Sequence, residues 1–389
     1  MTESRSVAVV GGGVSGLAAA YEAARRDTDV VLLEASPRLG GKVHTEMVDG
    51  FLVEAGPDSF VAPKRSVLEL AADLGIADRV IPASHVGGAH VWWGGRLHPL
   101  PEGLLLMAPS RLAPLFRSSL LSWRGKLRVL GDLVLPSGAN GDESLDSFVR
   151  RRLGSEVLER IAEPLVAGIH AARPDTMSLR ASFPRFLDME RNHRSLILAA
   201  RRARRQSRSQ GSHFMSFMGG MGELAGALVG ALPTDTVRTG VAVNRITARR
   251  QRGYRLETDD GGVIEAEGVV LATPAAVTAR LLETICPEAA DLVRGIGQVS
   301  TATVTLAYRA DEIPPLTGSG FVVPSAAQRK VMGVSYLSNK WTGRVPDDGY
   351  ALIRAFVRGS DRLADEDRLV ETARAEIAAL IGITAEPAL

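Results

Sequence analysis

The feature that most constrains the fold is a short apolar strand followed at once by a glycine-rich turn and a helix. Val7 to Val10 is a largely β-branched run, and Gly11-Gly12-Gly13-Val14-Ser15-Gly16 follows it without a break. Leu17 to Ala24 is rich in alanine and predicts a helix, and Val30 to Leu33 predicts a second strand that ends at Glu34. Strand, helix and strand in this order indicate an α/β unit with a parallel sheet.

The glycine spacing matches G-x-G-x-x-G, a dinucleotide-binding pattern in which each glycine has a steric reason. Gly11 allows a tight turn, Gly13 removes a side chain where a pyrophosphate approaches the backbone, and Gly16 lets helix and strand pack closely. The pyrophosphate is expected at the positive end of the helix. Glu34 can accept hydrogen bonds from the ribose hydroxyls of an adenosine and would repel the extra phosphate of NADP. We therefore predict a Rossmann-like domain.

A second glycine pair favours FAD over NAD as the dinucleotide. Arg38-Leu39-Gly40-Gly41-Lys42 comes shortly after Glu34. A simple nicotinamide-binding domain needs no glycine pair at this point. In flavoproteins that resemble amine oxidases and porphyrinogen oxidases, such a loop brings backbone and a basic side chain to the FAD phosphates. The resemblance implies that Lys42 lies against the cofactor and that Arg38 supports the loop.

Periodicity divides the rest of the chain into helical and sheet-like regions. Residues 104–230 are mainly helical, and short strand patterns resume from Thr236, so the helical block is predicted to be an insertion. Val91 to Leu100 predicts a hairpin that turns at Gly94-Gly95. Strand patterns between Thr301 and Val357 predict a second, antiparallel sheet, and a helix is expected from Asp365 to Ile381.

Several of these segments resemble the porphyrinogen oxidases of haem synthesis. Glu54 to Phe60 is similar to the segment beside the isoalloxazine ring, where Gly56 would permit close approach and Pro57 would fix the backbone. The resemblance runs from Ser6 to about Val357. The segments whose order and spacing match porphyrinogen oxidases better than amine oxidases or carotenoid desaturases are Glu143 to Phe148, Arg150 to Gly154, Glu163 to Ile169, Leu179 and Phe183-Pro184.

The resemblance implies an amine-oxidase-like architecture of the α/β class. It consists of a Rossmann-like FAD/NAD(P)-binding domain with an inserted helical domain and a second, mixed α+β substrate domain. The backbone at Val243 is expected to pair with the adenine ring. The predicted FAD-binding residues are Gly11, Gly12, Gly13, Val14, Ser15, Gly16, Glu34, Ala35, Arg38, Gly41, Lys42, Gly56, Pro57, Asp58, Ser59 and Val243.

The same resemblance suggests four segments. The FAD-binding domain is expected at residues 1–85 and 214–285, a substrate and helical domain at 86–213, and a substrate-binding sheet domain at 286–389. Porphyrinogen oxidases continue with another glycine-rich FAD segment, which the sequence lacks before it stops at Leu389. We therefore expect a fragment, a shortened homologue that binds FAD weakly, or a protein that has kept the fold and lost catalysis.

The resemblance leaves two possible substrates: protoporphyrinogen, which carries two propionates, and coproporphyrinogen, which carries four. Lys64-Arg65 and the segment Ala108 to Pro114 look more like the bacterial coproporphyrinogen-using branch, and Ala89 stands where the other branch has an arginine. Because more carboxylates demand more cations, Lys64, Arg65 and Arg111 are predicted to bind substrate. The alternative is that they are solvated surface charges.

The implied reaction is FAD-dependent oxidation of coproporphyrinogen III to coproporphyrin III, with oxygen as acceptor. The flavin performs the difficult chemistry, and the protein positions and shields the substrate. No catalytic residue is predicted, since no Ser-His-Asp set, metal cluster or evident general base is present. The alternatives are a protoporphyrinogen IX oxidase, an amine oxidase or carotenoid desaturase, and a non-catalytic FAD-fold protein.

The charge composition bears on whether the protein binds nucleic acid. The 46 basic and 44 acidic residues leave a net charge of +2, so no global field favours nucleic acid. The basic stretch Arg191 to Arg208 lacks aromatic residues for base stacking. We predict that it is a mobile surface helix or loop that meets a ferrochelatase partner or guides the anionic substrate. The single cysteine, Cys286, excludes an internal disulfide.

No apolar run is long enough to cross a bilayer, and the N-terminus lacks a signal-peptide core, so a cytoplasmic protein is expected. Leu104 to Leu135 mixes apolar runs with basic residues, as an interfacial helix pair would. Peripheral membrane contact is one interpretation of this segment. The other is that it forms the core and rim of the substrate domain.

Overall fold

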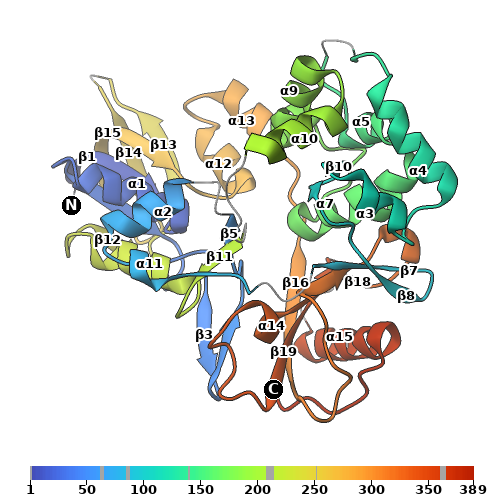
Figure 1. The fold of residues 1–389 in the computed structure, drawn as a ribbon. Coiled ribbons are helices and arrows are strands. Elements are labelled where there is room, and N and C mark those ends of the chain that lie inside the picture. Colours follow the sequence, from blue (N-terminus) through green and yellow to red (C-terminus); the bar gives the residue numbers. More distant parts are fainter. Residues whose placement is uncertain are drawn as a thin grey trace. The chain divides into compact units, whose positions relative to one another are not determined.

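The computed structural model describes residues 2–61, 65–84, 88–138, 141–206, 214–250, 252–359 and 365–389. The chain divides into two compact units, and each unit is built from two separate stretches of sequence (Figure 1). The first unit comprises Met1–Ala83 and Ser212–Gln298, and the second comprises Ser84–Gly211 and Val299–Leu389.

The first unit is organised around a six-stranded sheet with the strand order β12-β2-β1-β15-β14-β13. The first four strands in this order are parallel, and β14 and β13 add an antiparallel edge. In chain order the strands are β1 (Thr2–Val10), β2 (Val30–Glu34), β12 (Val237–Thr239), β13 (Val243–Ala248), β14 (Tyr254–Thr258) and β15 (Val263–Leu271).

Both faces of this sheet are buried around β1 and β2, which explains why Val7 to Val10 and Val30 to Leu33 are continuously apolar. Val9 and Leu32 pack on one face with Leu17, whereas their neighbours Ala8 and Val31 belong to a separate cluster on the other face. The helices of the unit are α1 (Val14–Ala24), α2 (Arg65–Asp73), η1 (Ala77–Arg79), α11 (Gly222–Gly230), α12 (Ala275–Leu282) and α13 (Pro287–Arg294).

Two small sheets complete the first unit. An antiparallel hairpin pairs β3 (Thr45–Val48) with β4 (Phe51–Glu54). In the other sheet, β11 (Phe214–Phe217) lies between β5 (Phe60–Val61) and β6 (Val80–Pro82). The second stretch of the first unit therefore enters through strand β11, which pairs with both β5 and β6.

The second unit contains a six-stranded sheet with the order β16-β19-β18-β17-β7-β8. It is antiparallel except where β17 runs parallel to β7. Its strands are β7 (His90–Trp93), β8 (Arg96–Pro99), β16 (Thr301–Arg309), β17 (Gly320–Val322), β18 (Val331–Tyr336) and β19 (Tyr350–Arg358). Helix α15 (Glu366–Ile381) packs on this sheet through Ala373, Ile377 and Leu380, and starts at Asp365, whose side chain accepts the N–H of Arg368.

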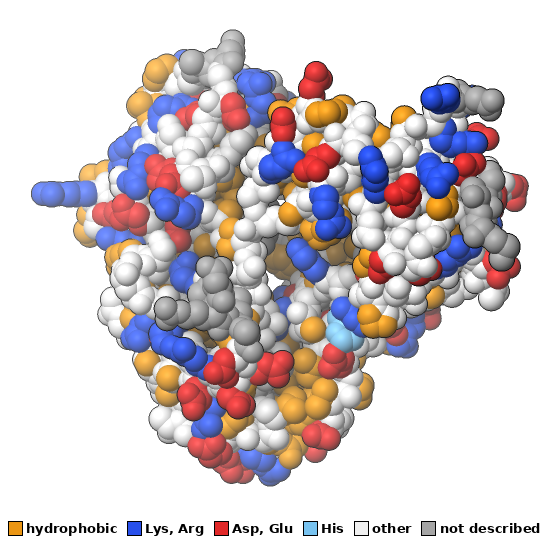
Figure 2. Space-filling model, turned by 180° about the vertical axis from the view of Figure 1, so that it is seen from behind, with side chains coloured by type: hydrophobic (Ala, Val, Ile, Leu, Met, Phe, Trp, Pro, Cys, Tyr) orange, Lys and Arg blue, Asp and Glu red, His pale blue; other side chains and the backbone are white. Residues whose placement is uncertain are grey.

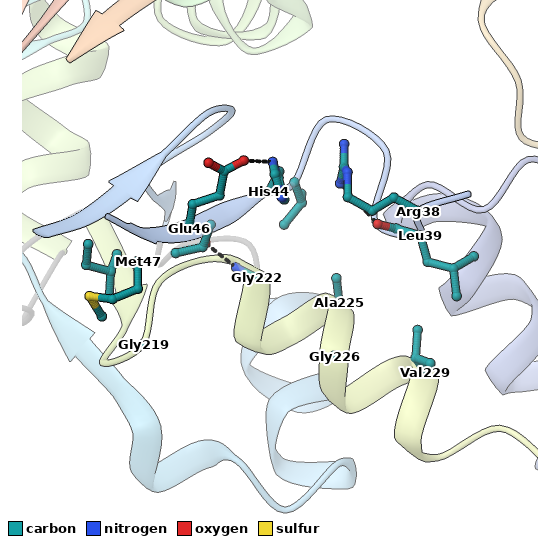
Figure 3. A pocket seen from close by; sticks show the side chains of 13 residues that line it. Arg38, Leu39, His44, Glu46, Met47, Gly219, Gly222, Ala225, Gly226 and Val229 are labelled. Carbon is teal, nitrogen blue, oxygen red and sulfur yellow. Dashed lines mark hydrogen bonds and ion pairs between the residues drawn. The ribbon is translucent and has the colours of Figure 1, made fainter. Parts of the chain in front are cut away.

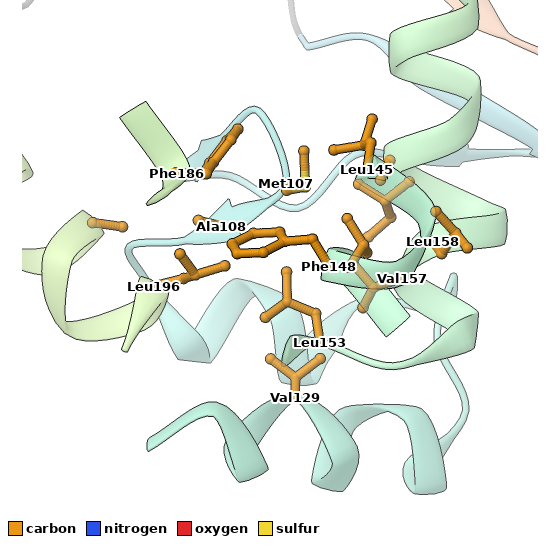
Figure 4. Packing of buried hydrophobic residues seen from close by; sticks show 14 of the residues in the cluster. Met107, Ala108, Val129, Leu145, Phe148, Leu153, Val157, Leu158, Phe186 and Leu196 are labelled. Carbon is orange, nitrogen blue, oxygen red and sulfur yellow. The ribbon is translucent and has the colours of Figure 1, made fainter. Parts of the chain in front are cut away.

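The helical part of the second unit has its own core, in which Phe148 is fully buried. Figure 4 shows the Phe148 ring among Ala108, Leu153 and Leu196. The elements of this part and of its links to the sheet are β9 (Leu104–Leu105), β10 (Ala108–Pro109), α3 (Leu112–Arg117), α4 (Trp123–Leu130), η2 (Gly131–Leu133), α5 (Leu145–Arg152), α6 (Ser155–Val157), η3 (Leu158–Ala162), α7 (Glu163–His170), α8 (Leu179–Ser182), α9 (Pro184–His193), α10 (Leu196–Gln206), η4 (Ser325–Ala327) and α14 (Leu337–Lys340).

A buried ion pair joins three of these helical elements. Arg152 and Asp132 are both 0% exposed, and the Arg152 Nε atom donates to Asp132 Oδ1 over 2.7 Å. Asp132 Oδ2 accepts hydrogen bonds from the Ser195 hydroxyl and from the Ile197 N–H, so it caps the start of α10. Arg152 also donates to the Arg194 carbonyl over 2.7 Å. The pair therefore ties η2 and α5 to the N-terminus of α10.

The predicted elements are largely present, but the predicted segment boundaries differ. The hairpin of β7 and β8 turns at Gly94 and Gly95, which both have positive φ, and α15 ends where Gly382 adopts φ 74°. The segment 86–213 is not separate from the later sheet, because β7 pairs with β17. Residues 286–298 belong to the first unit instead of the second sheet, since α13 packs against α12.

The basic stretch 191–208 contains a helix with exposed arginines, as one form of the prediction expected, and this helix is packed along one face. Its residues 196–206 form α10, and Leu196, Ile197, Ala199 and Ala200 are buried on one face of that helix. Arg208 lies outside the described residues. The exposed arginines of α10 thus lie on a helix whose opposite face is buried.

Replacing Arg152 by methionine should lower the free energy of unfolding by about 3–5 kcal/mol, because it leaves the buried Asp132 carboxylate without its cation. The measurement is urea denaturation followed by circular dichroism. Arg150→Met is the control: Arg150 also forms an ion pair, with Asp146 at 2.9 Å, but it is 45% exposed. That change should cost less than about 1 kcal/mol. Equal losses in the two variants would contradict the structural role of the buried pair.

Candidate functional site

The dinucleotide motif lies at the carboxyl ends of the parallel strands of the first unit. Gly11 follows β1, Glu34 ends β2, and Ala272 follows β15. The Gly11 N–H donates to the Leu33 carbonyl over 2.8 Å, and the Ala272 N–H donates to the Val10 carbonyl over 2.8 Å. Because β1 has β2 on one side and β15 on the other, this edge is the switch point at which α/β sheets bind ligands.

Two of the motif glycines are required by contacts inside the protein. Gly11 has φ 107°, and a Cβ atom there would lie 2.7 Å from the Ala272 carbonyl oxygen. A Cβ atom on Gly16 would collide with the Gly11 carbonyl oxygen. These glycines therefore let α1 approach the turn closely enough to pack, as the sequence motif predicts.

Gly13 is different, because no contact with the described residues requires it to be a glycine. Its backbone is extended, with φ −68° and ψ 174°, and no described atom lies within 4 Å of where its Cβ would be. Gly13 is the N-cap of α1 and has no side chain to satisfy the first N–H groups of the helix. A helix start of this kind is an anion site, so the backbone here fits the pyrophosphate of a dinucleotide.

Glu34 stands beside this turn and holds it. Glu34 Oε2 accepts the Gly12 N–H over 2.6 Å, and Oε1 accepts the Ser36 N–H over 2.8 Å. Partial burial raises the pKa of Glu34, but the hydrogen bonds from Ser36 and Gly12 outweigh it, and the net pKa is lowered below its usual value. The carboxylate is therefore ionised at neutral pH, and both of its oxygens act only as acceptors.

The loop Arg38 to Lys42 is attached directly to the turn. The Gly40 N–H donates to the Gly12 carbonyl over 2.9 Å, and a Cβ atom on Gly41 would lie 3.0 Å from the Gly13 Cα. Arg38 donates to the Leu39 carbonyl over 3.1 Å and to the Gly41 carbonyl over 2.8 Å. Arg38 thus supports the loop from within, and the Lys42 side chain is exposed.

The segment that begins at Gly56 is in turn packed against this loop. A Cβ atom on Gly56 would collide with the Lys42 carbonyl oxygen. The structure therefore supplies a reason for glycine at this position that is independent of the flavin ring. Ala35 and Pro57 are exposed, and Ser59 donates to Asp58 over 2.8 Å. The Asp58 carbonyl accepts the Ser216 hydroxyl over 2.8 Å, so β11 supports this segment.

Glu54 was not predicted as a site residue, yet it positions the start of the Gly56 segment. Glu54 is 1% exposed and accepts the Thr45 hydroxyl over 2.6 Å and the Met221 N–H over 2.7 Å. Thr45 accepts the Gly222 N–H over 2.8 Å. Together they satisfy the N-terminus of α11. A carboxylate at the end of the apolar run 51–53 is the one sequence signal that could have indicated this role.

The segment before Val243, the predicted adenine-binding residue, contacts Glu34 and Ser36. The Val241 N–H donates to the Glu34 carbonyl over 3.0 Å, and the Gly240 N–H donates to the Ser36 carbonyl over 3.0 Å. The ladder between β13 and β14 is irregular just after Val243, between its pairing with Thr258 and that of Arg245 with Glu257. Val243 thus lies two residues after a main-chain contact with Glu34, and its side chain belongs to the same buried cluster as Leu33.

The predicted substrate residues that the structure describes belong to different units. Lys64 lies outside the described residues, and Arg65 is the first residue of α2 in the first unit. Arg111 is in the second unit, where it donates to Glu102 over 3.0 Å. Ala89 precedes β7, and its carbonyl accepts the Leu100 N–H over 3.0 Å.

A cavity of about 510 Å³ adjoins the cofactor motif in the first unit. Figure 3 shows Ala225 and Val229 of α11 facing the loop that carries Arg38 and Leu39. On its wall His44 Nδ1 lies 3.0 Å from Glu46 Oε1. None of the residues Gly11 to Gly16 lines the cavity, so it borders the predicted dinucleotide site without being that site.

Two titratable groups of the second unit have shifted pKa values. Burial lowers the pKa of His98, which contacts the Ser119 hydroxyl at 2.8 Å and the Trp93 carbonyl at 3.1 Å, so the imidazole is neutral at neutral pH. Burial raises the pKa of Glu163, although its carboxylate accepts the Ser325 N–H over 3.1 Å. Glu163 follows the π-helical turn η3, a local irregularity that often marks a functional region.

Among the described residues no three His, Cys, Asp or Glu side chains are placed to hold a metal ion. Every helix in the described ranges is too short or too polar to cross a membrane. Figure 2 shows basic and acidic side chains interspersed over one face of the molecule.

Comparison with known proteins agrees with this geometry. The family model for flavin containing amine oxidoreductases matches residues 14–389. A coproporphyrinogen III oxidase from Propionibacterium freudenreichii is 36% identical over 98% of this chain and 78% of its own length. One from Bacillus subtilis is 31% identical over 98% of this chain and 84% of its own length. A solved structure from Exiguobacterium, named provisionally as a protoporphyrinogen oxidase, is 32% identical with a TM-score of 0.86 and covers 100% of this chain and 86% of its own.

Gly13→Val should abolish FAD binding and leave the fold intact. The extended backbone of Gly13 accepts a β-branched residue, and no described atom opposes the new side chain, which would occupy the place of the pyrophosphate. Flavin absorbance after dialysis against FAD measures binding, and thermal denaturation without FAD measures the fold. The matched variant Gly16→Val should lose both, because its Cβ collides with the Gly11 carbonyl. FAD retained by Gly13→Val would overturn the assignment of the site.

Proposed function

Since the chain belongs to the family of flavin containing amine oxidoreductases and its cofactor is FAD, we propose that it oxidises coproporphyrinogen III to coproporphyrin III in haem biosynthesis. The observation that carries the proposal is that relatives named coproporphyrinogen III oxidase match almost the whole chain. The glycine contacts around Gly13 and the ionised Glu34 support it, because they fit the pyrophosphate and ribose of FAD.

The proposed electron acceptor is oxygen. Conversion of the porphyrinogen to the porphyrin removes about six electrons and six protons, and bound FAD supplies two-electron oxidation, so roughly three cycles are needed. The balanced reaction consumes one oxygen molecule and releases one hydrogen peroxide in each cycle. The four carboxylates of the substrate do not change.

The residues of the chain act in this proposal by binding and positioning. Glu34 orients the ribose, and the N-terminus of α1 at Gly13 holds the pyrophosphate. Arg38 keeps the loop in place, and the contact between Gly56 and the Lys42 carbonyl sets where the following segment runs. Such positioning lowers the entropic part of the barrier without any acid or base.

The choice of coproporphyrinogen rests on charge. Each added propionate calls for a cation, and Lys64, Arg65 and Arg111 are the proposed substrate-binding residues. Arg111 forms an ion pair with Glu102, whose side chain is 78% exposed. The carboxylate of a substrate could therefore replace Glu102 as the partner of Arg111. Oxidation of protoporphyrinogen IX is the alternative, favoured by the name of the Exiguobacterium structure.

The proposal includes a cytoplasmic location with peripheral contact to a membrane surface. Helix α4 carries Trp123, 69% exposed, and Leu127, 62% exposed, one turn apart. Val134 is 73% exposed further along the chain. An exposed tryptophan and leucine beside the exposed Arg124 form the kind of surface that enters the headgroup region of an anionic bilayer. Contact with a ferrochelatase stays a prediction.

The FAD-loaded protein should oxidise coproporphyrinogen III at least about tenfold more efficiently than protoporphyrinogen IX, since a lost charge-assisted hydrogen bond costs about 1.5–3 kcal/mol. Porphyrin fluorescence with both porphyrinogens gives the two values of kcat/KM. Preference for protoporphyrinogen would correct the substrate. Turnover of an amine or a polyene with no porphyrin formed would reject the proposed function.

Trp123→Ser combined with Leu127→Ser should reduce binding to vesicles of phosphatidylglycerol and phosphatidylcholine by about tenfold or more, because it removes the exposed apolar surface of α4. Flotation of the protein with the vesicles measures this. Leu292→Ser in α13 is the control, since Leu292 is exposed but lies in the first unit. If the unsubstituted protein does not float at any salt concentration, the residues 104–135 serve only as the core and rim of the unit.

A further inference from the structure

A pocket of about 310 Å³ in the second unit is lined by two segments that are distant in the sequence. Residues 110–113, which run from the end of β10 into the first turn of α3, form one part of the wall, and the last turns of α10 form the other. Four of its lining side chains are arginines: Arg111, Arg201, Arg204 and Arg205.

The scaffold presents these arginines in a defined arrangement. Asp132 caps the start of α10 through Ser195 and Ile197, and the apolar face of α10 is buried. The other wall begins at Ser110, which is 8% exposed and donates through its hydroxyl to the Gly103 carbonyl over 2.7 Å. Both walls are therefore held by contacts that do not involve the guanidinium groups.

The charges in the pocket are unbalanced. Arg111 is paired with Glu102 on the surface, and no acidic residue occurs within α10. In the part of the chain that the structure describes, Arg201, Arg204 and Arg205 have no ion pair or hydrogen-bond partner through their side chains. Guanidinium groups gathered around one hollow repel one another, and a bound anion would offset that repulsion. The planar guanidinium also matches a carboxylate bidentately.

We propose that this arginine pocket binds carboxylate groups of the tetrapyrrole substrate and prefers molecules that carry more of them. This inference rests on the proposed function. The pocket is at the small end of the range for ligand sites, so it would take the propionate-bearing edge of a macrocycle instead of the whole ring. Nucleic acid fits less well, because the lining contains no aromatic side chain on which a base could stack.

The experiment compares Arg201→Gln/Arg205→Gln with the control Arg202→Gln in the full FAD-loaded chain. Arg202 is an exposed arginine of the same helix that does not line the pocket, and glutamine preserves helix propensity. Coproporphyrin III, protoporphyrin IX and the uncharged tetramethyl ester of coproporphyrin III are the probes. Quenching of protein fluorescence gives each Kd.

The double variant should bind coproporphyrin III about tenfold more weakly for each guanidinium lost, with a smaller effect on protoporphyrin IX and none on the ester. KM for coproporphyrinogen III should rise while kcat stays the same, since these arginines are assigned to binding only. The control should match the unsubstituted protein, and added salt should weaken only the binding of the charged probes.

Unchanged binding and KM in the double variant would overturn the inference, and so would an equal loss in Arg202→Gln. A loss of vesicle or DNA binding with unchanged porphyrin affinity would also overturn it, because it would assign the pocket to another class of partner. If no porphyrinogen is oxidised but coproporphyrin III binding still depends on Arg201 and Arg205, the proposed function fails and the pocket assignment stands.

Discussion

The cofactor site depends on direct contact between backbones at glycine positions. Gly16 allows α1 to reach the Gly11 carbonyl, Gly41 lies against Gly13, and Gly56 lies against the Lys42 carbonyl. The contacts at Gly16 and Gly56 exclude a Cβ atom, and the contact at Gly41 leaves little room for one, so the first turn, the following loop and the later segment pack directly on one another. Glu34 and Glu54 then hold the two ends of this surface through hydrogen bonds from main-chain N–H groups.

The helical part of the second unit is held by a buried ion pair. The buried pair of Arg152 and Asp132 satisfies the start of α10 and connects it to α5 and η2. Burying two charges is costly unless nearly every hydrogen-bonding atom finds a partner, and here the partners include the main-chain groups of Asp132, Pro136, Arg194 and Ile197. As a result, α10 has a defined position, and the arginines on its outer face are held beside Arg111.

The chemistry of this family is supplied by its cofactor, which explains why the sequence contains no recognisable catalytic set. In the proposed function, the protein contributes an anion site at Gly13, an ionised acceptor at Glu34, and arginines that pair with the carboxylates of the substrate. Residues such as Gly16 and Glu54 influence function only through the geometry they impose, so substitutions there are expected to affect folding together with cofactor binding.

The sequence by itself determined the local features. The glycine spacing, the strand before it and the acidic residue at Glu34 predict the Rossmann-like turn, because steric limits on glycine and strand periodicity act over a few residues. Only the tertiary structure decided which distant segments meet. It joined β7 to β17, assigned α13 to the first unit, and placed Arg111 beside the arginines of α10. These outcomes depend on packing between residues far apart in the chain, which leaves no short-range pattern in the sequence.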